Sequence, residues 1–209
     1  MDDSDFYNFL VESFTNAEKH LKEGGAFYVF YASREHRNFE NALEQVGLTT
    51  KQQLIWVKNS LIIGRQDYQW QHEPCLYGWK EGAAHYFTED RSLATIIENK
   101  QDFENMKKED MKKLLEEIFQ IPTSCIRENR PTRSDLHPTM KPIKLCAKLI
   151  QNSTKPGETV LDLFGGSGST LMACEQIDRT CYMMELDPKY CDVIIQRWEE
   201  YTGQKVVKL

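Results

Sequence analysis

The chain has 209 residues, 40% of them hydrophobic, which is enough for one α/β domain with an inserted lobe. Its net charge of −6 argues against indiscriminate nucleic-acid binding, and no apolar run approaches the ~18 residues of a membrane span. The acidic start, Met1 to Asp5, lacks the basic and apolar regions of a signal peptide, so we expect a cytoplasmic protein with no membrane partner.

Apolar residues at helical spacing predict a helix over 6–21, ended by Gly24-Gly25, and then an aromatic-rich strand over 26–31. A helix over 38–46 follows, and then two strands, over 54–58 and 75–79, which we expect to pair as a hairpin at the edge of the sheet. The predicted loop between these strands, 59–74, is long. It is crowded with side chains able to stack or hydrogen-bond, a composition typical of functional loops.

The pattern changes between 81 and 135, where a charged amphipathic helix is predicted over 102–120. Residues 127–148 carry six basic against two acidic side chains, and 51–65 carry three basic side chains and no acid. Two basic stretches on an acidic protein suit a groove for a polyanion, and they are equally typical of two solvated faces. The motif 137–142 then leads into a predicted helix over 143–151, with Pro142 near its start.

A glycine–serine loop joins a predicted strand over 159–164 to a predicted helix over 170–175. Glycine lets a ligand approach the bare backbone, and the helix start offers unpaired N–H groups. No Lys follows Gly168, as a phosphate loop requires, and Leu171 stands where a dinucleotide fingerprint has its last Gly. Glu185 ends a predicted strand over 182–185, close to the ~20-residue spacing from Asp162 at which an acid reaches ribose hydroxyls. The combination indicates S-adenosylmethionine, and the alternative is a tight strand–helix turn with an exposed Glu.

The cysteines and histidines show no metal-binding pattern. The six Cys residues form no Cys-x-x-Cys pair, and the five His residues are scattered along the chain. We therefore predict free core thiols and no metal site.

Three segments together resemble a known family: His-Pro-Thr-Met-Lys-Pro at 137–142, Val-Leu-Asp-Leu-Phe-Gly-Gly-Ser-Gly-Ser-Thr at 160–170 and Met-Glu-Leu-Asp-Pro-Lys-Tyr at 184–190. They resemble the amino-methylating DNA methyltransferases, the adenine-N6 and cytosine-N4 enzymes of the circularly permuted type. The resemblance implies an α/β, Rossmann-like S-adenosylmethionine-dependent fold. It places a target-base half in 1–80, a target-recognition region with a small helical lobe in 81–135, and the cofactor half in 136–209.

The resemblance also implies site residues. The expected contacts to S-adenosylmethionine, with Glu185 on the ribose, are Thr139, Lys141, Asp162, Phe164, Gly165, Gly166, Ser167, Gly168 and Glu185. A double-stranded DNA partner would present a base flipped out of the duplex, because its amino group cannot otherwise reach the methyl group. The candidates for contacts to DNA or to that base are Lys58, Arg65, Tyr68, Trp70, Arg127, Arg130 and Arg133. The alternatives are hairpin core packing for the aromatic residues and a solvated linker for the three later arginines.

One departure from the family affects the chemistry. The family carries its catalytic residues on an Asp/Asn/Ser-Pro-Pro-Tyr/Phe loop after its fourth strand, and Pro-Pro does not occur within 1–209. We therefore assign no catalytic residue and expect the central fourth strand to be missing too, which would leave two half-sheets with exposed edges.

That departure leaves two hypotheses open. The first is a site-specific DNA amino-methyltransferase, adenine N6 favoured over cytosine N4. In it the chain is an N-terminally truncated form, or one piece of a split enzyme, that binds cofactor weakly and is inactive alone. The second is a non-catalytic module with the cofactor fold, which binds DNA or a partner chain.

Overall fold

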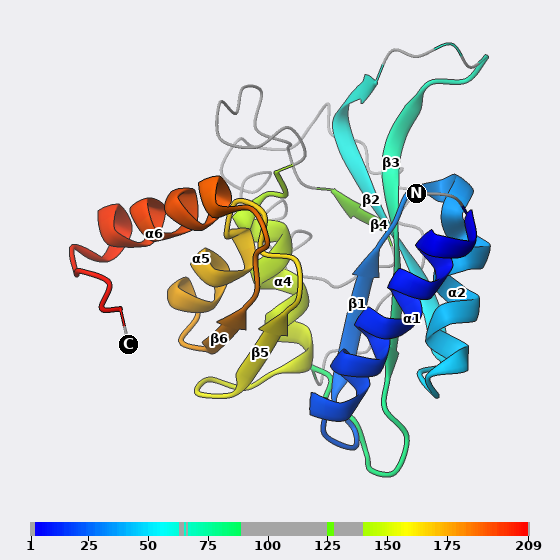
Figure 1. The fold of residues 1–209 in the computed structure, drawn as a ribbon, viewed down its shortest axis with the longest axis horizontal. Coiled ribbons are helices and arrows are strands. Elements are labelled where there is room, and N and C mark those ends of the chain that lie inside the picture. Colours follow the sequence, from blue (N-terminus) through cyan, green and yellow to red (C-terminus); the bar gives the residue numbers. More distant parts are fainter. Residues whose placement is uncertain (1–2, 63–64, 66, 89–124, 128–139, 209) are drawn as a thin grey trace, which may run out of the picture.

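The computed structural model describes residues 3–62, 65, 67–88, 125–127 and 140–208 (Figure 1). The chain combines helices and strands, with β2, β3 and β4 in succession among the described elements. In order they are α1 (Asp3–His20), β1 (Ala26–Phe30), the 3-10 turn η1 (Ser33–Glu35), α2 (His36–Gln45), β2 (Thr50–Ile62), β3 (Trp70–Trp79), β4 (Cys125–Arg127), α4 (Ile143–Ser153), β5 (Thr159–Asp162), α5 (Ser169–Gln176), β6 (Thr180–Met183) and α6 (Pro188–Thr202).

The strands form two separate sheets. The larger sheet has the order β1-β3-β2-β4, in which β3 is antiparallel to both neighbours and β4 is parallel to β2. The smaller sheet is the parallel pair β5-β6. Among the described residues no strand pairing joins the two sheets, which agrees with the expectation of two half-sheets.

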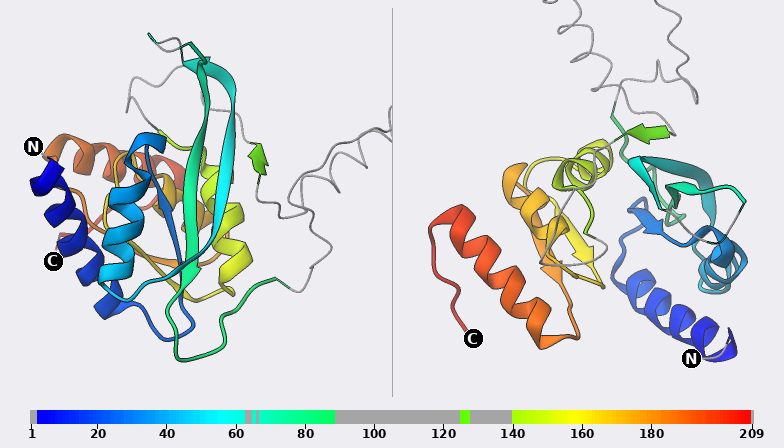
Figure 2. Two further views of the ribbon diagram at one scale, coloured as in Figure 1. Left: turned by 90° about the vertical axis from the view of Figure 1, so that its right-hand side faces the viewer. Right: turned by 90° about the horizontal axis from the view of Figure 1, so that it is seen from above.

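Helices cover both faces of the larger sheet (Figures 1 and 2). Alternate residues of a strand point to opposite faces, so Leu76 packs with Leu10 of α1 and Leu43 of α2, while Cys75 and Tyr77 face α4. The α4 side of the core is closed by the fully buried Leu145 and by Trp56, Leu54 and Leu149. Because α4 also packs along α5, this one helix joins the two sheets.

The hairpin of β2 and β3 is longer than predicted. Its pairing was predicted correctly, with Leu54 opposite Cys75, but the strands continue to Ile62 and from Trp70, so the predicted loop over 59–74 is wrong. The edge position is wrong as well, because β3 lies between β1 and β2, and β2 itself pairs with β4. Cross-strand pairing extends these strands through residues whose own pattern suggested a loop.

Two further differences concern the other elements. The C-terminal helix α6 was not predicted, although Asp187 accepts from the N–H of Lys189 as its N-cap and Pro188 occupies its first turn. Strand β6 begins and ends two residues earlier than predicted, so Glu185 lies just beyond its end. The predicted helix over 102–120 lies outside the described residues.

A seam separates the two sheets, with β1 on one side and β5 on the other (Figures 1 and 2). Within the described part of the chain, β1 pairs only with β3 and β5 only with β6. All five β1 residues are only half-buried, although the strand is a continuous apolar run, Ala-Phe-Tyr-Val-Phe. Such runs are typical of strands with both faces covered, and residues of β1 pack into the cores on both faces of the larger sheet.

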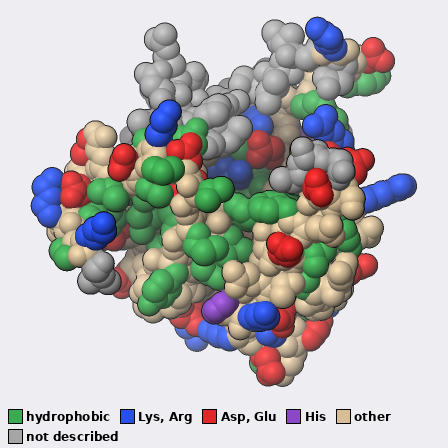
Figure 3. All heavy atoms as spheres, viewed as in Figure 1, with side chains coloured by type: hydrophobic (Ala, Val, Ile, Leu, Met, Phe, Trp, Pro, Cys, Tyr) green, Lys and Arg blue, Asp and Glu red, His purple; other side chains and the backbone are tan. Residues whose placement is uncertain are grey.

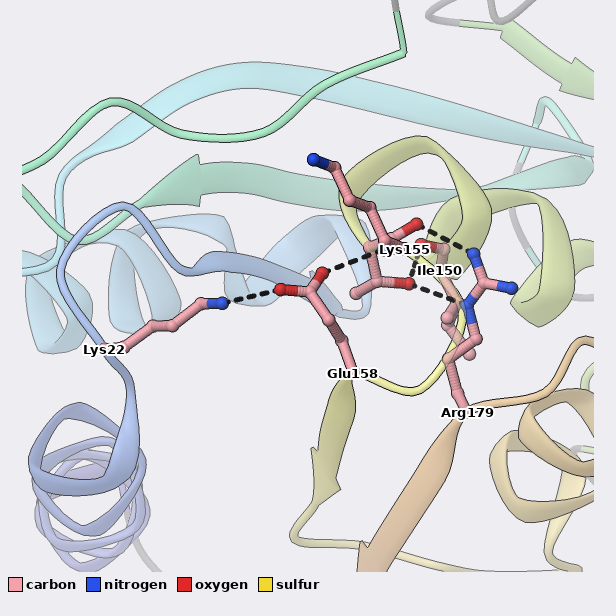
Figure 4. A network of polar contacts seen from close by, with 6 residues as sticks. Lys22, Ile150, Lys155, Glu158 and Arg179 are labelled. Atoms are coloured by element: carbon pink, nitrogen blue, oxygen red, sulfur yellow. Dashed lines mark hydrogen bonds and ion pairs between the residues drawn. The ribbon is translucent and has the colours of Figure 1, made fainter.

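Side chains clamp the seam at its lower end. The ammonium of Lys22, which follows α1, donates to Glu158 at the start of β5 at 2.8 Å (Figure 4). The other oxygen of Glu158 accepts from the N–H of Lys155, and the hydroxyl of Tyr28 in β1 lies 2.7 Å from that of Ser153 in α4. The two sheets are therefore held at a fixed separation without backbone pairing between them. No described helix is both long and apolar enough to cross a membrane.

Candidate cofactor and target site

The glycine loop between β5 and α5 is anchored to β6. The N–H of Gly165 donates to the carbonyl of Met184 at 2.8 Å, and the N–H of Met184 donates to the carbonyl of Asp162 at 2.9 Å. Gly168 adopts a left-handed φ of 77° as the N-cap of α5, and Gly166 has a φ of 53°. The loop therefore depends on backbone geometry that favours glycine.

Gly165 is glycine for a packing reason. A Cβ atom there would lie 2.7 Å from Sδ of Met183, a side chain of β6. The close approach of the loop to β6 leaves no room for that atom. The family resemblance implies that this glycine contacts the cofactor. The structure shows that Gly165 also packs closely against Met183.

Glu185 closes the loop from the end of β6. Its two carboxylate oxygens accept from the N–H of Gly166 at 2.6 Å and from the N–H of Asp187 at 2.9 Å. The N–H of Asp187 and then that of Gly166 hold the pKa of the Glu185 carboxyl below its ordinary value. The group is therefore anionic at neutral pH, and its half-exposed oxygens keep lone pairs for a further donor such as a sugar hydroxyl.

Two buried serines tie the loop to other helices. Ser169, the first residue of α5, donates its hydroxyl to the carbonyl of Lys141 at 2.8 Å, just before α4. The carbonyl of Ser167 accepts from the guanidinium of Arg197 in α6, whose pKa is lowered by burial. The start of α5 is thus fixed from two sides.

Apolar side chains surround the mouth of this loop. Phe164 is 56% exposed, with its ring 5.9 Å from that of Phe9 in α1, and Leu186 is 97% exposed. Leu161, Tyr182 and Met184 add exposed apolar area along β5 and β6. Hydrophobic side chains gather over the middle of the face seen in Figure 3. Exposed apolar side chains beside a carboxylate suit a nucleoside with a small attached group.

A cluster of three charged side chains, of which Lys58 is buried, lies where β2, β3 and the segment before α4 meet. The ammonium of Lys58, only 6% exposed, lies 2.7 Å from Oε1 of Glu73, and the ammonium of Lys141 lies 3.8 Å from Oε2 of the same carboxylate. Lys58 also lies over the ring of Trp56 and Lys141 over that of Phe30. We call these three charged residues the Lys58–Glu73–Lys141 bridge. Lys141 lies at the carboxyl end of β1, the kind of sheet edge where open α/β sheets bind ligands, and Lys58 lies within β2.

The tip of the β2–β3 hairpin projects away from the body of the protein (Figures 1 and 2). Tyr68 is 91% exposed and Trp70 is 42% exposed, with its ring edge-on to that of His72 at 5.3 Å. Arg65 is exposed as well. The alternative for these aromatic residues was packing in the hairpin core, and the exposure of Tyr68 argues against it for that residue.

The structure brings together most of the predicted cofactor residues and separates the predicted DNA residues. Arg65, Tyr68 and Trp70 share the hairpin tip, whereas Lys58 is buried in the bridge, a position that argues against contact with a phosphate. Arg127 lies in β4, opposite Val57 of β2. Thr139, Arg130 and Arg133 lie outside the described residues.

Three residues of the site were not predicted: Ser169, Glu73 and Arg197. The position of Ser169 beside the start of the predicted helix was an available signal. Glu73 gave none, because only the pairing of β2 with β3 brings it to Lys58. Arg197 gave no signal, because its partner is a carbonyl on a distant loop. Cys75, Cys146, Cys174, Cys181 and Cys191 are free thiols, and no group of three potential metal ligands occurs within the described ranges.

A family model described as DNA methylase, N6_N4_Mtase, matches residues 1–197. The chain belongs to this family. The predicted family membership is therefore confirmed.

Several relatives in this family are type II methyltransferases. M.HpaI of Haemophilus parainfluenzae is 24% identical over 200 residues, which cover 95% of this chain and 61% of that protein. M2.MboI of Moraxella bovis is 24% identical over 96% of this chain and 68% of its own length. M.BglII of Bacillus subtilis is 22% identical over 73% of this chain and 43% of its own length. The chain thus spans between 43% and 68% of the length of these relatives.

Solved structures show the same fold. The M1.HpyAVI–SAM complex superposes with a TM-score of 0.71 at 24% identity, over 95% of this chain and 85% of that one. The PvuII DNA methyltransferase, described as cytosine-N4-specific, gives a TM-score of 0.68 at 18% identity, over 95% and 72%. The predicted α/β methyltransferase fold is confirmed.

Proposed function

We propose that this chain carries the cofactor-binding and target-handling parts of an S-adenosylmethionine-dependent DNA amino-methyltransferase. The observation that carries the proposal is the glycine loop held against Glu185, an anionic carboxylate at the end of β6. Membership of the DNA methylase family and the fold shared with the M1.HpyAVI–SAM complex support it.

The residues present fit this cofactor. Glu185 would accept from the ribose hydroxyls, and the loop from Phe164 to Gly168 would hold the methionine part, with Asp162 beneath it. Lys141, and Thr139 by family resemblance, would close the amino-acid end. The bound cofactor supplies an electrophilic methyl group on a sulfonium. The chain's own residues orient it, and the apolar mouth around Phe164 excludes water.

The reaction would take place on DNA. The cofactor would supply its methyl group to an exocyclic amino nitrogen of the target base, and one amine proton would pass to water. We favour adenine N6 over cytosine N4, and we propose Arg65, Tyr68 and Trp70 at the hairpin tip as contacts to DNA or to the flipped base. The three share one projecting surface, which supports this assignment.

We also infer that a further β-strand fills the seam between β1 and β5, supplied by a second chain or by a longer form of this one. Three features support this inference: the half-buried apolar run of β1, the edge of β5 without a described partner strand, and the Lys22–Glu158 ion pair that links the two sides of the seam. Open edges of this kind are templates for strand addition. The proposed strand would carry the catalytic loop that the family requires.

Calorimetry with S-adenosylmethionine tests the cofactor site. The chain is titrated alone and in the presence of a segment that carries the family's fourth strand and catalytic loop. Binding is expected to be weak alone and stronger with the segment. Glu185→Ala is expected to abolish cofactor binding, because the ribose loses its hydrogen-bond acceptor. Glu200→Ala, which replaces an exposed acid of α6, is expected to leave cofactor binding unchanged. No heat under either condition would refute the cofactor assignment.

A methyl-transfer assay on unmethylated DNA tests the completing strand. The purified chain alone is expected to show no multiple turnover, and the complemented chain to transfer methyl groups. Robust turnover by 1–209 alone would refute the need for a further strand. Cofactor binding without any transfer in the complemented form would favour the second hypothesis, a non-catalytic module.

A further inference from the structure

A continuous chain of polar contacts runs from the larger sheet to the glycine loop. It begins at Lys58 in β2, whose ammonium lies 2.7 Å from Oε1 of Glu73 in β3. Oε2 of Glu73 lies 3.8 Å from the ammonium of Lys141, and the carbonyl of Lys141 accepts from the hydroxyl of Ser169 at 2.8 Å. The Ser169 hydroxyl is in turn 3.4 Å from that of Ser167 in the loop.

Glu73 is the only member of this path that faces a cation on either side. Lys58 is 6% exposed and needs a nearby anion to remain charged in that position. The carboxylate is less buried and reaches across to Lys141, whose ammonium also lies 4.9 Å from the ring centre of Phe30 at the end of β1. Two cations therefore share one carboxylate.

The position of Lys141 matters for the loop because both ends of this residue are engaged. Its ammonium is held by the larger sheet, and its carbonyl holds the first residue of α5. A shift of Lys141 would therefore be passed to Ser169 and to Gly168, the left-handed N-cap of the same helix. A neutral amide in place of the carboxylate would still accept from Lys58, but it would no longer attract Lys141 by charge.

We propose that Glu73 is a positioning residue that couples the target half of the protein to the glycine loop through Lys141. Glu73 does not touch the reacting atoms. It fixes the start of α4, and thereby the start of α5, in the geometry that binds the cofactor. The predicted effect of Glu73 on cofactor binding rests on the proposed function. The coupling between Glu73 and the glycine loop does not require a bound ligand.

Hydrogen exchange on the ligand-free chain tests the coupling directly. In Glu73→Gln, the amides of 165–169 are expected to exchange about fivefold faster than in the wild type, which corresponds to a loss of about 1 kcal/mol of coupling. The matched control is Glu81→Gln, which neutralises the partner of Lys51 at the other end of the same hairpin. Equal exchange in the loop for both variants would overturn the proposal.

A double-mutant cycle with Ser169→Ala separates coupling from general loosening. If Glu73 acts through Lys141 and Ser169, the effects of Glu73→Gln and Ser169→Ala on loop exchange are not additive, whereas additive effects contradict the path. Should Glu73→Gln fail to fold, the double variant Lys58→Met/Glu73→Leu removes the buried charge pair together. For this double variant we likewise expect the amides of 165–169 to exchange faster than in the wild type.

Cofactor affinity gives a second readout. In the complemented protein, Glu73→Gln is expected to weaken binding about fivefold and Glu81→Gln to leave it unchanged. If the wild type binds no cofactor, the proposed function fails while the exchange result still decides the coupling. If the wild type binds and both variants bind equally well, the coupling fails and the proposed function stands.

Discussion

Single residues of the site owe their identity to neighbours from distant parts of the chain. A Cβ at Gly165 would lie 2.7 Å from Sδ of Met183 in β6, and two backbone N–H groups lower the pKa of Glu185. Both effects arise from the same contact between the glycine loop and the end of β6. The loop and that strand end therefore form one unit.

Gly165→Ala is expected to destabilise the protein by about 2 kcal/mol, because the added Cβ would lie 2.7 Å from Sδ of Met183. Urea unfolding measures the change. In Gly165→Ala/Met183→Ala the clash is absent, so the two substitutions should cost less together than the sum of their separate effects. Strict additivity would contradict the close approach.

Glu185 should make stability depend on pH in an acidic window. Its folded-state pKa lies below its ordinary value of 4.5, so its stabilising contribution is complete above that value and is lost as the pH falls through the folded-state pKa. We expect the melting temperature of the wild type to fall more steeply than that of Glu185→Gln between about pH 5 and pH 3. Parallel curves for the two proteins would show that the carboxylate makes no such contribution.

At the scale of elements, local spacing predicted some features and failed on others for a physical reason. The glycine loop, the strand before it and α5 after it were predictable from turn residues and from the spacing of apolar residues close in sequence, whereas α6 was not predicted. The length of the β2–β3 hairpin depends on pairing across strands, which the pattern of either strand alone does not contain. The Lys58–Glu73–Lys141 bridge could not be predicted either, because sheet pairing and the start of α4 bring its members together.

The hairpin tip is expected to bind DNA without stabilising the fold. Tyr68 is 91% exposed, so Tyr68→Ala should change the free energy of unfolding by less than about 0.5 kcal/mol. It should weaken binding of a DNA duplex in a fluorescence anisotropy titration. Tyr201→Ala, an exposed tyrosine of α6, is the control. Equal DNA affinities for the two variants would remove the tip from the proposed interface.

At the scale of the whole molecule, α4 is the element that makes two sheets into one body. Its fully buried Leu145 packs against the larger sheet, and the same helix packs along α5 beside the smaller one. Contacts at the Lys22–Glu158 clamp and between Phe9 and Phe164 add to this connection. The two sheets should therefore unfold together.

Leu145→Ala is expected to cost about 3 kcal/mol, since it leaves a cavity in the shared core. Fluorescence of the larger sheet is followed in Trp198→Phe, and fluorescence of Trp198 in α6 is followed in a variant with Trp56, Trp70 and Trp79 replaced by Phe. The two signals should report one coincident transition. Lys144→Ala, an exposed neighbour in α4, is the control. Two separated transitions in the otherwise unchanged chain would show that the halves are independent.

The projecting hairpin also has a mechanical consequence. The last pair between β1 and β3 is Phe30 with Cys75, so the five β3 residues before Cys75 extend about 17 Å past the end of β1. Over that arm, a rotation of about 10° at the base displaces the tip by about 3 Å, close to the rise of one base pair along a duplex. Glu73 lies within this arm near its base, so we expect a tilt of the arm at this point to move the tip by a distance of this size.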